Sequence, residues 1–299
     1  MRTERANAKI NLYLDVVSKR ENGYHNIQSL MQTVSLCDLV TLEYRPSIHT
    51  SIQMRASGND AMPADCRNLA WRAAEKLLAR AERSGEVLII LEKHIPMAAG
   101  LAGGSADAAA VLRGLNALLG SPLSADALCA LGAELGADIP FCILGGCAHV
   151  SGIGEELESL PSMGECPMVV ACMGEGVSTP WAYGKLDEMN GDFLLPKEAD
   201  PRLEQLIADL KNGVTPPDIH AFYNIFEEVV PNEKPAVTAL KSSMLANGAL
   251  RAMMSGSGPS VFGIFASVQE AERACSAARE LGADAFVCHP RPAYRKFSK

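Results

Sequence analysis

The sequence predicts an α+β protein built from two domains. The chain has 299 residues, which corresponds to about two domains at the usual ~150 residues each. In both halves, predicted strands are followed by helices that return to an antiparallel sheet, which is the pattern of an α+β fold. Glycine, proline and acidic residues cluster between residues 152 and 166, as at a domain junction. We therefore expect an N-terminal domain over residues 1–158 and a C-terminal domain over residues 159–299.

Hydrophobic periodicity predicts the elements of the first half. Residues 8–17 alternate apolar and polar side chains, which is typical of a strand. A polar turn containing Asp38 is expected between the next two strands. Ser105 is expected to begin a helix after a stretch of glycine and alanine. After the first strand, the expected elements are strands over 30–34 and 39–44, a helix over 68–81, a strand over 87–92, helices from 105 and over 124–135, and a strand over 143–150.

The second half is expected to begin with a strand and to continue, after a loop, with three helices. A glycine-rich turn then leads into the next strand. The expected elements are a strand over 168–172, helices over 201–210, 222–229 and 235–246, a strand over 261–265, a helix over 268–281 and a strand over 285–288.

Composition and charge narrow the range of functions. The formal net charge is −8, and a protein that binds nucleic acids or anionic membranes broadly needs a basic face. The nine cysteines include no C-x-x-C pair and no Cys/His cluster at zinc spacing, so we expect reduced thiols in the cytosol. No signal-peptide core and no apolar run of ~20 residues is present. These features predict a cytoplasmic protein that binds neither nucleic acid nor membrane, and they do not exclude an anionic small ligand.

The strongest local signal for function is the glycine-rich segment Pro96–Ser105, which joins a predicted strand to a predicted helix. Gly100, Gly103 and Gly104 let the backbone fold tightly, so that successive amide groups point at one anion. The positive end of the following helix adds to this attraction. Ser105 offers a hydroxyl to a phosphate oxygen or to Mg²⁺. The segment is not a Walker A loop, and the alternative is a tight turn with no ligand.

Three weaker signals accompany this segment. Lys9 lies in the first strand, where a lysine is usually a solvent-facing residue. Asp138 follows a helix and precedes Pro140 and an apolar run, so it is either a desolvated base or the cap of the next element. Met254–Ser260 is a second glycine turn, which either belongs to a nucleotide site or only leads into a strand.

Together, in this order and spacing, these four signals resemble the GHMP kinase superfamily. The phosphate loop of that superfamily begins P-x₃-G-L and ends in Ser followed by Ser or Ala, as Pro96–Ala106 does here. Its glycine-rich C-terminal motif is matched by Ser255–Ser260. Further segments resemble one branch of the superfamily, the kinases of a cytidine diphosphate conjugate of methylerythritol in the non-mevalonate isoprenoid pathway. These segments are Ala8–Leu14, Gly23–His25, Leu30–Leu36, Gly136–Gly146 and Ser178–Tyr183.

The resemblance implies a fold, a reaction and a set of site residues. The implied N-terminal domain is of the ribosomal-protein-S5-domain-2 type, the C-terminal domain is ferredoxin-like, and ATP with Mg²⁺ phosphorylates a crowded tertiary hydroxyl in the cleft between them. Asp138 falls at the family's catalytic base. Lys9 falls at its catalytic lysine, which would hold Asp138 ionised and stabilise charge on the transferring phosphoryl group. The implied ATP-binding residues are Pro96, Ala98, Gly100, Leu101, Ala102, Gly103, Gly104 and Ser105, with Asn68 and Lys93 beside the adenine.

The resemblance also implies a cytosine pocket. Tyr24 and Tyr183 match an aromatic pair that stacks on the base, and His25 matches a histidine that reads its edge. Without the resemblance, a surface turn after Gly23 would explain Tyr24 and His25. The other implied substrate-binding residues are Asn11, Thr179, Gly256, Ser257 and Gly258.

Two departures from the fullest form of the phosphate loop bear on the site. Met97–Ala99 stand where some members carry more glycine, which we expect to be harmless because the other glycines of the loop remain. Ala106 replaces a frequent second serine, which leaves the protein ligands of Mg²⁺ open.

Two alternative functions remain at this point. Another GHMP kinase, acting on homoserine or mevalonate, would share the loop and the fold but would need no cytosine pocket. A non-catalytic nucleotide-binding module would keep the glycine loops, but the presence of both Lys9 and Asp138 speaks against it, because binding ATP requires neither. The sequence also leaves open whether the protein is a monomer or a homodimer.

Overall fold

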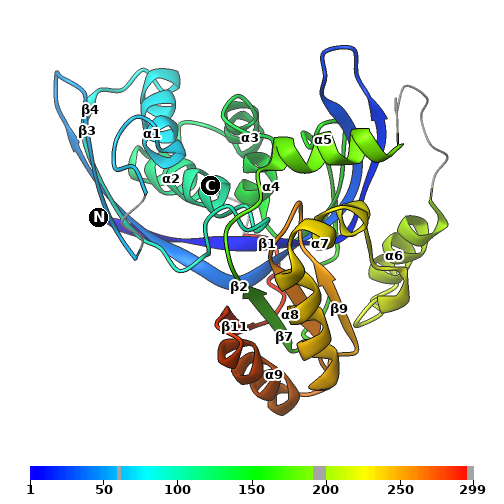
Figure 1. Cartoon of the computed structure of the whole chain (residues 1–299). Coiled ribbons are helices and arrows are strands. Elements are labelled where there is room, and N and C mark those ends of the chain that lie inside the picture. Colours follow the sequence, from blue (N-terminus) through cyan, green and yellow to red (C-terminus); the bar gives the residue numbers. More distant parts are fainter. Residues whose placement is uncertain (59–61, 191–199, 295–299) are drawn as a thin grey trace.

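Two sheets organise the chain. The structure is a computed structural model that describes residues 1–58, 62–190 and 200–294. These residues form a seven-stranded, mainly antiparallel sheet and a four-stranded antiparallel sheet, with helices packed on both (Figure 1). The predicted α+β fold class is confirmed.

The first sheet is built around a long hairpin. β1 (Arg2–Lys19) and β2 (His25–Pro46) pair antiparallel from Arg2↔Leu42 to Lys19↔His25. Because β2 runs without a break, the turn predicted at Asp38 is wrong, and this carboxylate is buried within the strand. The other strands of this sheet are β3 (Ser51–Ser57), β4 (Gly85–Glu92), β5 (Cys147–Ser151), β6 (Glu156–Leu160) and β8 (Tyr223–Asn224).

The pairing of the remaining strands shows how the two halves of the chain share this sheet. β4 pairs antiparallel with the second part of β2, and β3 lies parallel to β4. β5 pairs with the first part of β2, and β6 pairs with β5. β8 comes from the second half of the chain and pairs parallel with β1. The expected domain boundary after residue 158 falls within β6, two residues before that strand ends.

Two irregularities in β1 determine which of its side chains reach the site. The pairing with β2 shifts between Asn7 and Lys9 and again between Asn11 and Tyr13. A bulge of this kind bends and twists a strand, and bulges are frequent beside active sites. Between the two shifts, Ile10 packs in a hydrophobic core, so Lys9 and Asn11 lie on the other face of the strand.

Four helices cover one face of the first sheet (Figure 1): α1 (Leu69–Arg80), α2 (Gly103–Leu118), α3 (Ala125–Ala133) and α4 (Ile139–Leu144). Asn68 and Ser124 cap α1 and α3 by accepting hydrogen bonds from backbone N–H groups of the first turn. α2 begins two residues earlier than the predicted start at Ser105.

A strand was predicted over 143–150. The first part of this prediction is wrong. Residues 139–144 form α4, and β5 begins only at Cys147. A short apolar run does not distinguish a buried helix from a buried strand by its periodicity. Pro140 in the first turn favours the helix, because proline has no N–H group to lose there.

The second sheet has the strand order β11-β7-β10-β9, and every pair is antiparallel. In chain order this is strand, helices, two strands, helix and strand, which is the ferredoxin-like arrangement that was predicted. Its elements are β7 (Met168–Cys172), α5 (Thr179–Asn190), α6 (Pro201–Lys211), α7 (Val230–Glu233), α8 (Pro235–Ala246), β9 (Arg251–Met254), β10 (Val261–Ile264), α9 (Val268–Glu280) and β11 (Asp284–Cys288).

Two predictions in the second half differ from the structure. The helix predicted over 222–229 is instead β8 followed by a 3₁₀ turn over Ile225–Glu228, after an earlier 3₁₀ turn over Ile219–Ala221. The loop expected after β7 contains the three-turn helix α5.

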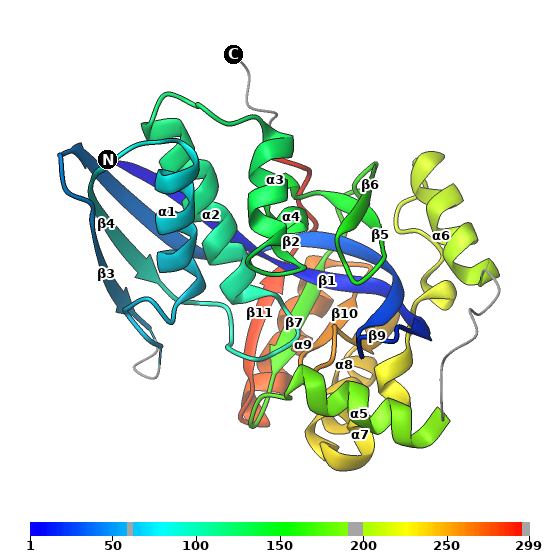
Figure 2. The same ribbon diagram turned by 90° about the horizontal axis from the view of Figure 1, so that it is seen from above.

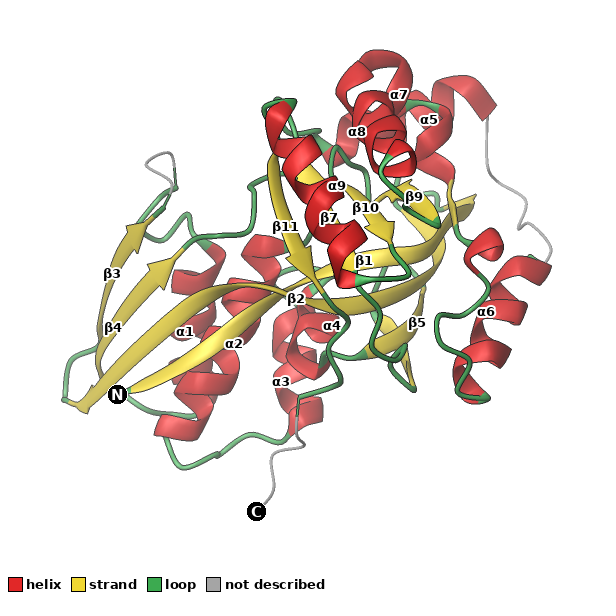
Figure 3. Ribbon diagram, turned by 90° about the horizontal axis from the view of Figure 1, so that it is seen from below, coloured by secondary structure: helices red, strands yellow, loops and turns green. Residues whose placement is uncertain are grey.

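The two sheets pack face to face, with β1 and β2 crossing over β7 and β10 (Figure 2). Alternate residues of β7 explain how one strand serves two cores. Met168 and Val170 pack with Ile10 of β1, whereas Val169 and Ala171 pack under α8 and α9 on the other face (Figure 3). Among the described residues, no helix is both long and apolar enough to cross a membrane.

Candidate active site

The phosphate loop places three free amide groups at the start of α2. The first hydrogen bond of this helix runs from the N–H of Ala106 to the carbonyl of Ala102, so the N–H groups of Gly103, Gly104 and Ser105 have no partner within the helix. Such a helix start binds anions, because the amide dipoles and the free donors point the same way. Gly104 is exposed, so the amide groups face an accessible surface.

The alanines of this loop adopt backbone angles that favour glycine. Ala98 has a φ of 51° and Ala102 a φ of 56°. A left-handed conformation costs a residue with a Cβ roughly 1–2 kcal/mol. The replacement of glycine by alanine in this loop was expected to be harmless, and at Ala98 the structure shows local strain instead. Contacts on both sides of the loop must hold it in place.

Those contacts come from the second half of the chain. The Ser255 hydroxyl donates a hydrogen bond to the carbonyl of Gly100 over 3.1 Å, and the N–H of Ser260 donates to the carbonyl of Ala99 over 3.2 Å. A Cβ on Gly100 would lie 2.1 Å from the carbonyl oxygen of Ser255, and one on Gly256 would lie 2.8 Å from the carbonyl oxygen of Gly100. The second glycine turn therefore interlocks with the phosphate loop, backbone against backbone.

Lys9 is buried beside the phosphate loop. Its backbone N–H donates to the carbonyl of Leu101 over 3.1 Å, and its Nζ donates to Oδ1 of Asn11 over 2.8 Å. Asn11 in turn donates to the hydroxyl of Ser29, which donates to the carbonyl of Tyr13. This chain of hydrogen bonds fixes the ammonium group. The solvent-facing alternative for Lys9 is wrong.

Asp138 points its carboxylate toward Lys9. The distance from Lys9 Nζ to Asp138 Oδ2 is 3.9 Å, and the aspartate side chain is 34% exposed. Asp138 occupies the N-cap position of α4 but makes no capping hydrogen bond. Its φ of −78° and ψ of −14° are helical, whereas a capping residue normally has extended angles. The structure therefore excludes the cap as the role of Asp138, and its role as a base stays a prediction.

Lys93 lies beneath the loop rather than on an open surface. Its ammonium group is buried and bonded to the carboxylates of Asp38 and Asp107. Burial raises the pKa of Asp107 to about 7, against the lowering effect of Lys93. Asn68, the other residue expected near the adenine, uses its side chain to cap α1. Asn68 is close to the loop, because the side chain of the next residue, Leu69, lies beside Gly104. Lys93 has no such freedom, because its ammonium group is bonded to two carboxylates.

One face of α5 carries the substrate residues predicted in the second half. Thr179, Tyr183 and Asp187 are four residues apart and share that face. The hydroxyls of Thr179 and Ser257 are 3.0 Å apart, which joins α5 to the second glycine turn. Burial, and to a smaller extent the charge of Asp138, raise the pKa of the Tyr183 hydroxyl above its ordinary range. The tyrosine hydroxyl therefore lies within electrostatic range of the Asp138 carboxylate.

Tyr24 and His25 are neighbours at the tip of the β1–β2 hairpin, but they lie in different environments. Tyr24 follows a turn at Gly23 and is 59% exposed. His25 begins β2, and its ring stacks on Tyr183 with centroids 4.7 Å apart. Tyr24 thus lies at a surface turn, whereas the His25 ring lies against Tyr183 of α5.

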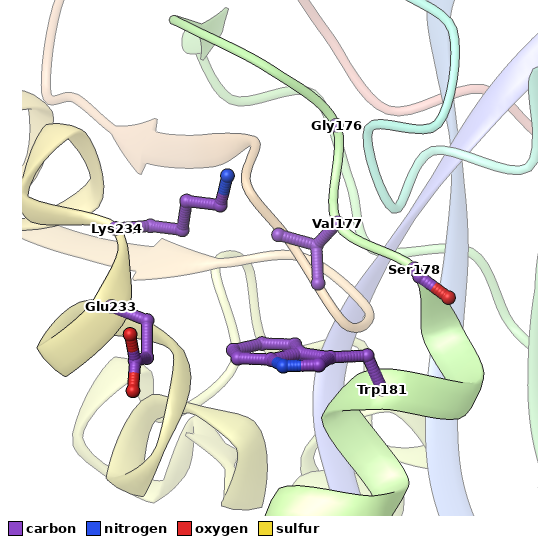
Figure 4. A pocket seen from close by; sticks show the side chains of 6 residues that line it. All are labelled: Gly176, Val177, Ser178, Trp181, Glu233 and Lys234. Atoms are coloured by element: carbon purple, nitrogen blue, oxygen red, sulfur yellow. The ribbon is translucent and has the colours of Figure 1, made fainter.

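A separate pocket of about 330 Å³ opens on the opposite face of α5 (Figure 4). Trp181 and Ser178 line it from the α5 side, and Glu233 and Lys234 line it from α7 and the residue after it. Its lining contains none of the predicted site residues. The hydrogen bond from the N–H of Val177 to the carbonyl of Ala98 shows that the pocket wall also supports the phosphate loop.

Most of the predicted site residues thus lie near the phosphate loop and α5. The structure also shows buried polar residues beside them that were not predicted. The buried polar residues Ser29, Asp38 and Asp107 gave no local signal, because each acts through a partner distant in sequence. Asp187 lies four residues after Tyr183 and eight after Thr179, a spacing that would have indicated one helix face if a helix had been expected there.

Comparison with known proteins agrees with this geometry. The sequence profile of the GHMP kinases N terminal domain matches residues 68–146, and that of the GHMP kinases C terminal region matches residues 203–284. A homoserine kinase from Cytophaga hutchinsonii shares the fold, with a TM-score of 0.71, 21% identity and 95% of each chain covered. The chain belongs to the GHMP kinases, which use ATP.

Two further comparisons narrow the family. A 4-diphosphocytidyl-2-C-methyl-D-erythritol kinase from Synechococcus sp. (strain JA-2-3B'a(2-13)) is 43% identical over 274 residues, covering 90% of this chain and 86% of the relative. A crystal structure of 4-(cytidine 5'-diphospho)-2C-methyl-D-erythritol kinase aligns with a TM-score of 0.80 and 34% identity, covering 97% of this chain and 99% of that one. Within the GHMP kinases, the chain belongs to the 4-diphosphocytidyl-2-C-methyl-D-erythritol kinase family.

Proposed function

We propose that this kinase transfers the γ-phosphoryl group of ATP to the 2-hydroxyl of 4-diphosphocytidyl-2-C-methyl-D-erythritol, with Asp138 as the base. The observation that carries the proposal is the position of Lys9. Its backbone is bonded to the phosphate loop at Leu101, and its ammonium group lies 3.9 Å from the free carboxylate of Asp138. Lys9 therefore contacts both the loop proposed to bind ATP and the carboxylate proposed to activate the substrate hydroxyl.

Phosphoryl transfer requires no covalent bond between the protein and the substrate. Phosphoryl transfer depends mainly on positioning and on electrostatic stabilisation of the charge that develops on the transferring group. Asp138 accepts the proton of the attacking hydroxyl, which is tertiary and a poor nucleophile. Lys9, whose ammonium group is fixed by Asn11, places its positive charge 3.9 Å from that carboxylate. The free amides of Gly103–Ser105 hold the phosphates of ATP.

Mg²⁺ is part of this proposal as the companion of ATP. It binds hard oxygen ligands and usually keeps several waters while it contacts phosphates and one or two carboxylates. The hydroxyl of Ser105 and one buried oxygen of Asp107 that has no hydrogen-bond partner fit this requirement. When bound, the ion neutralises charge on the phosphates.

The nucleotide end of the substrate fits the cluster at the hairpin tip. A base that stacks on an aromatic ring gains about 1–3 kcal/mol, whichever base it is. Tyr24 and Tyr183 are the proposed stacking residues, and selection of cytosine must come from a polar group at its edge. His25, which lies on Tyr183, is the proposed reader of that edge. The nine free thiols support the further proposal that the enzyme works in the cytosol.

Release of ADP, followed with three acceptors, tests the proposed function. The acceptors are the cytidyl conjugate, homoserine and mevalonate, each with ATP and Mg²⁺. A site built to hydrogen-bond one substrate rejects analogues that lack those groups by about 10⁴-fold or more in kcat/KM. We expect that margin in favour of the cytidyl conjugate. Comparable or higher kcat/KM with homoserine or mevalonate would assign the chain to another branch of the GHMP kinases.

A further inference from the structure

His25 contacts Asp187, and recognition of the base by His25 does not by itself require this contact. Lys19 and His25 are directly paired across the β1–β2 hairpin, so their side chains lie on the same face of the sheet. Both reach Asp187 on α5. Oδ1 of Asp187 lies 2.8 Å from Nε2 of His25, and Oδ2 lies 2.6 Å from Nζ of Lys19.

Burial distinguishes the histidine from its two charged partners. The His25 side chain is only 8% exposed, compared with 22% for Asp187 and 30% for Lys19. A carboxylate accepts hydrogen bonds and donates none, so Nε2 of His25 must carry the proton between them. The hydrogen bond to Lys19 holds the carboxylate in one orientation and leaves a single oxygen for the histidine.

We propose that Asp187, held by Lys19, is a positioning residue that makes the enzyme select cytosine by fixing the tautomer of His25. With Nε2 protonated, Nδ1 of the neutral ring is an acceptor. An acceptor at the base edge pairs with the exocyclic amino group of cytosine and meets the carbonyl oxygen of uracil with repulsion. This inference rests on the proposed function, because it concerns how His25 reads the base.

Asp187→Asn is the informative variant because it keeps the shape and changes the hydrogen-bond pattern. Lys19 retains the amide oxygen as its acceptor, so the amide nitrogen faces Nε2 of His25 and donates to it. The proton of the imidazole then moves to Nδ1. In Ser–His–Asp triads the same replacement leaves the geometry intact and produces the wrong tautomer.

Two measurements follow the variant. Dissociation constants of CDP and UDP, measured by calorimetry, give the preference for cytosine without requiring turnover. The ¹⁵N spectrum of the imidazole at pH 8, above the ordinary titration range of histidine, gives the tautomer directly. We expect the CDP over UDP preference to fall by about 10- to 100-fold, since a mismatched buried hydrogen bond costs that much. We expect the His25 signal to change from the Nε2–H to the Nδ1–H pattern.

Glu188→Gln is the matched control. Glu188 is the next residue of α5, lies on the other side of the helix and pairs with Lys185 over 2.8 Å at the surface. Both the preference and the tautomer should stay as in the unmodified enzyme.

The outcomes separate the inference from the proposed function. If the unmodified enzyme does not prefer CDP to UDP, the proposed cytosine pocket is wrong. If it prefers CDP, and Asp187→Asn keeps both that preference and the Nε2–H tautomer, the inference fails while the function stands. An equal loss of affinity for CDP and UDP with an unchanged tautomer also overturns it, because Asp187 would then only fasten the hairpin to α5.

Discussion

At the scale of single residues, the availability of Asp138 comes from the backbone that carries it. The residue stands where a helix cap would stand, yet its helical φ and ψ turn the carboxylate away from the amides of α4. An aspartate that capped α4 would have its lone pairs occupied. The proposed base is therefore a carboxylate that no amide of α4 occupies.

Replacing Asp138 by asparagine should remove the base and keep the shape. We expect kcat for the cytidyl substrate to fall by roughly 10²–10⁴-fold, which is the usual contribution of a positioned base. The KM for ATP should stay nearly unchanged, because the phosphate loop is intact. Steady-state ADP release measures both constants.

Asp126→Asn serves as the control, since Asp126 is an exposed carboxylate in the first turn of α3. It should leave kcat as it is. Nearly full activity of Asp138→Asn would show that a substrate phosphate or a water accepts the proton instead.

The sequence predicted the residues of this site better than it predicted their partners. Lys9 and Asp138 were identified because the motifs around them resemble a known family. The buried bonds of Lys93 to Asp38 and Asp107 were not predicted, because they join the residue after β4 to β2 and α2, which no local pattern connects. Asp38 looked like a turn residue, since an aspartate is rare inside a strand unless a buried cation neutralises it.

At the scale of elements, the phosphate loop depends on two kinds of glycine. Gly100 is needed by the protein itself, because a Cβ there would meet the carbonyl oxygen of Ser255 at 2.1 Å. Gly104 is different. A Cβ on Gly104 would have only a methyl group of Leu69 nearby, at 3.9 Å, and its φ is not in the left-handed region. The protein itself therefore does not require glycine at this position, and the proposed reason is space for the phosphates of ATP.

Gly104→Val tests that difference. The side chain fits the free protein, so the melting temperature should change by a few degrees at most. The same side chain would occupy the space through which phosphates approach the amides of α2, so binding of ATP should be lost. Calorimetry with ATP and thermal unfolding measure the two effects separately.

Gly184→Val is the matched control, because Gly184 is also helical and has open space around its Cβ position. It should bind ATP normally. An unchanged affinity for ATP in Gly104→Val would mean that the loop is a structural turn and not a phosphate site.

Helices and strands whose hydrophobic residues follow a clear pattern were predicted, and an element without such a pattern was not. α1, α9 and three strands of the second sheet (β7, β10 and β11) were predicted from their hydrophobic residues, whereas β9 was not. α5 was expected to be a loop, because its site-facing positions carry Thr179, Tyr183 and Asp187 instead of core residues. A helix that turns a functional face inward loses the apolar periodicity from which helices are predicted.

At the scale of the whole molecule, the site exists only because the two halves of the chain hold each other. β8 from the second half pairs with β1, and the second glycine turn interlocks with the phosphate loop. The end of the described chain also returns to the first half. Pro290 bridges to Val34, and the N–H of Tyr294 donates to the carbonyl of Leu144, the last residue of α4.

This return bears on catalysis because α4 carries Asp138 at its start. Tyr294 also donates through its hydroxyl to Asn7 and stacks under the guanidinium of Arg113, which donates to the carbonyl of Cys142 in α4. The contacts of Tyr294 could not be predicted from the sequence, since they join residues more than 100 positions apart. The two-domain fold and a site between its halves were predicted, but the contacts that join the halves were not.

The product of the reaction tests the proposed function most directly. ³¹P and ¹³C NMR spectra of a mixture of enzyme, ATP, Mg²⁺ and the cytidyl substrate identify every phosphorus species and the carbon to which a new phosphate is attached. The predicted result is one new phosphomonoester on carbon 2 of the methylerythritol part for each ADP formed, with the cytidine diphosphate resonances retained. Release of inorganic phosphate alone, or a phosphate on a different hydroxyl, would contradict the proposed positions of Asp138 and the substrate.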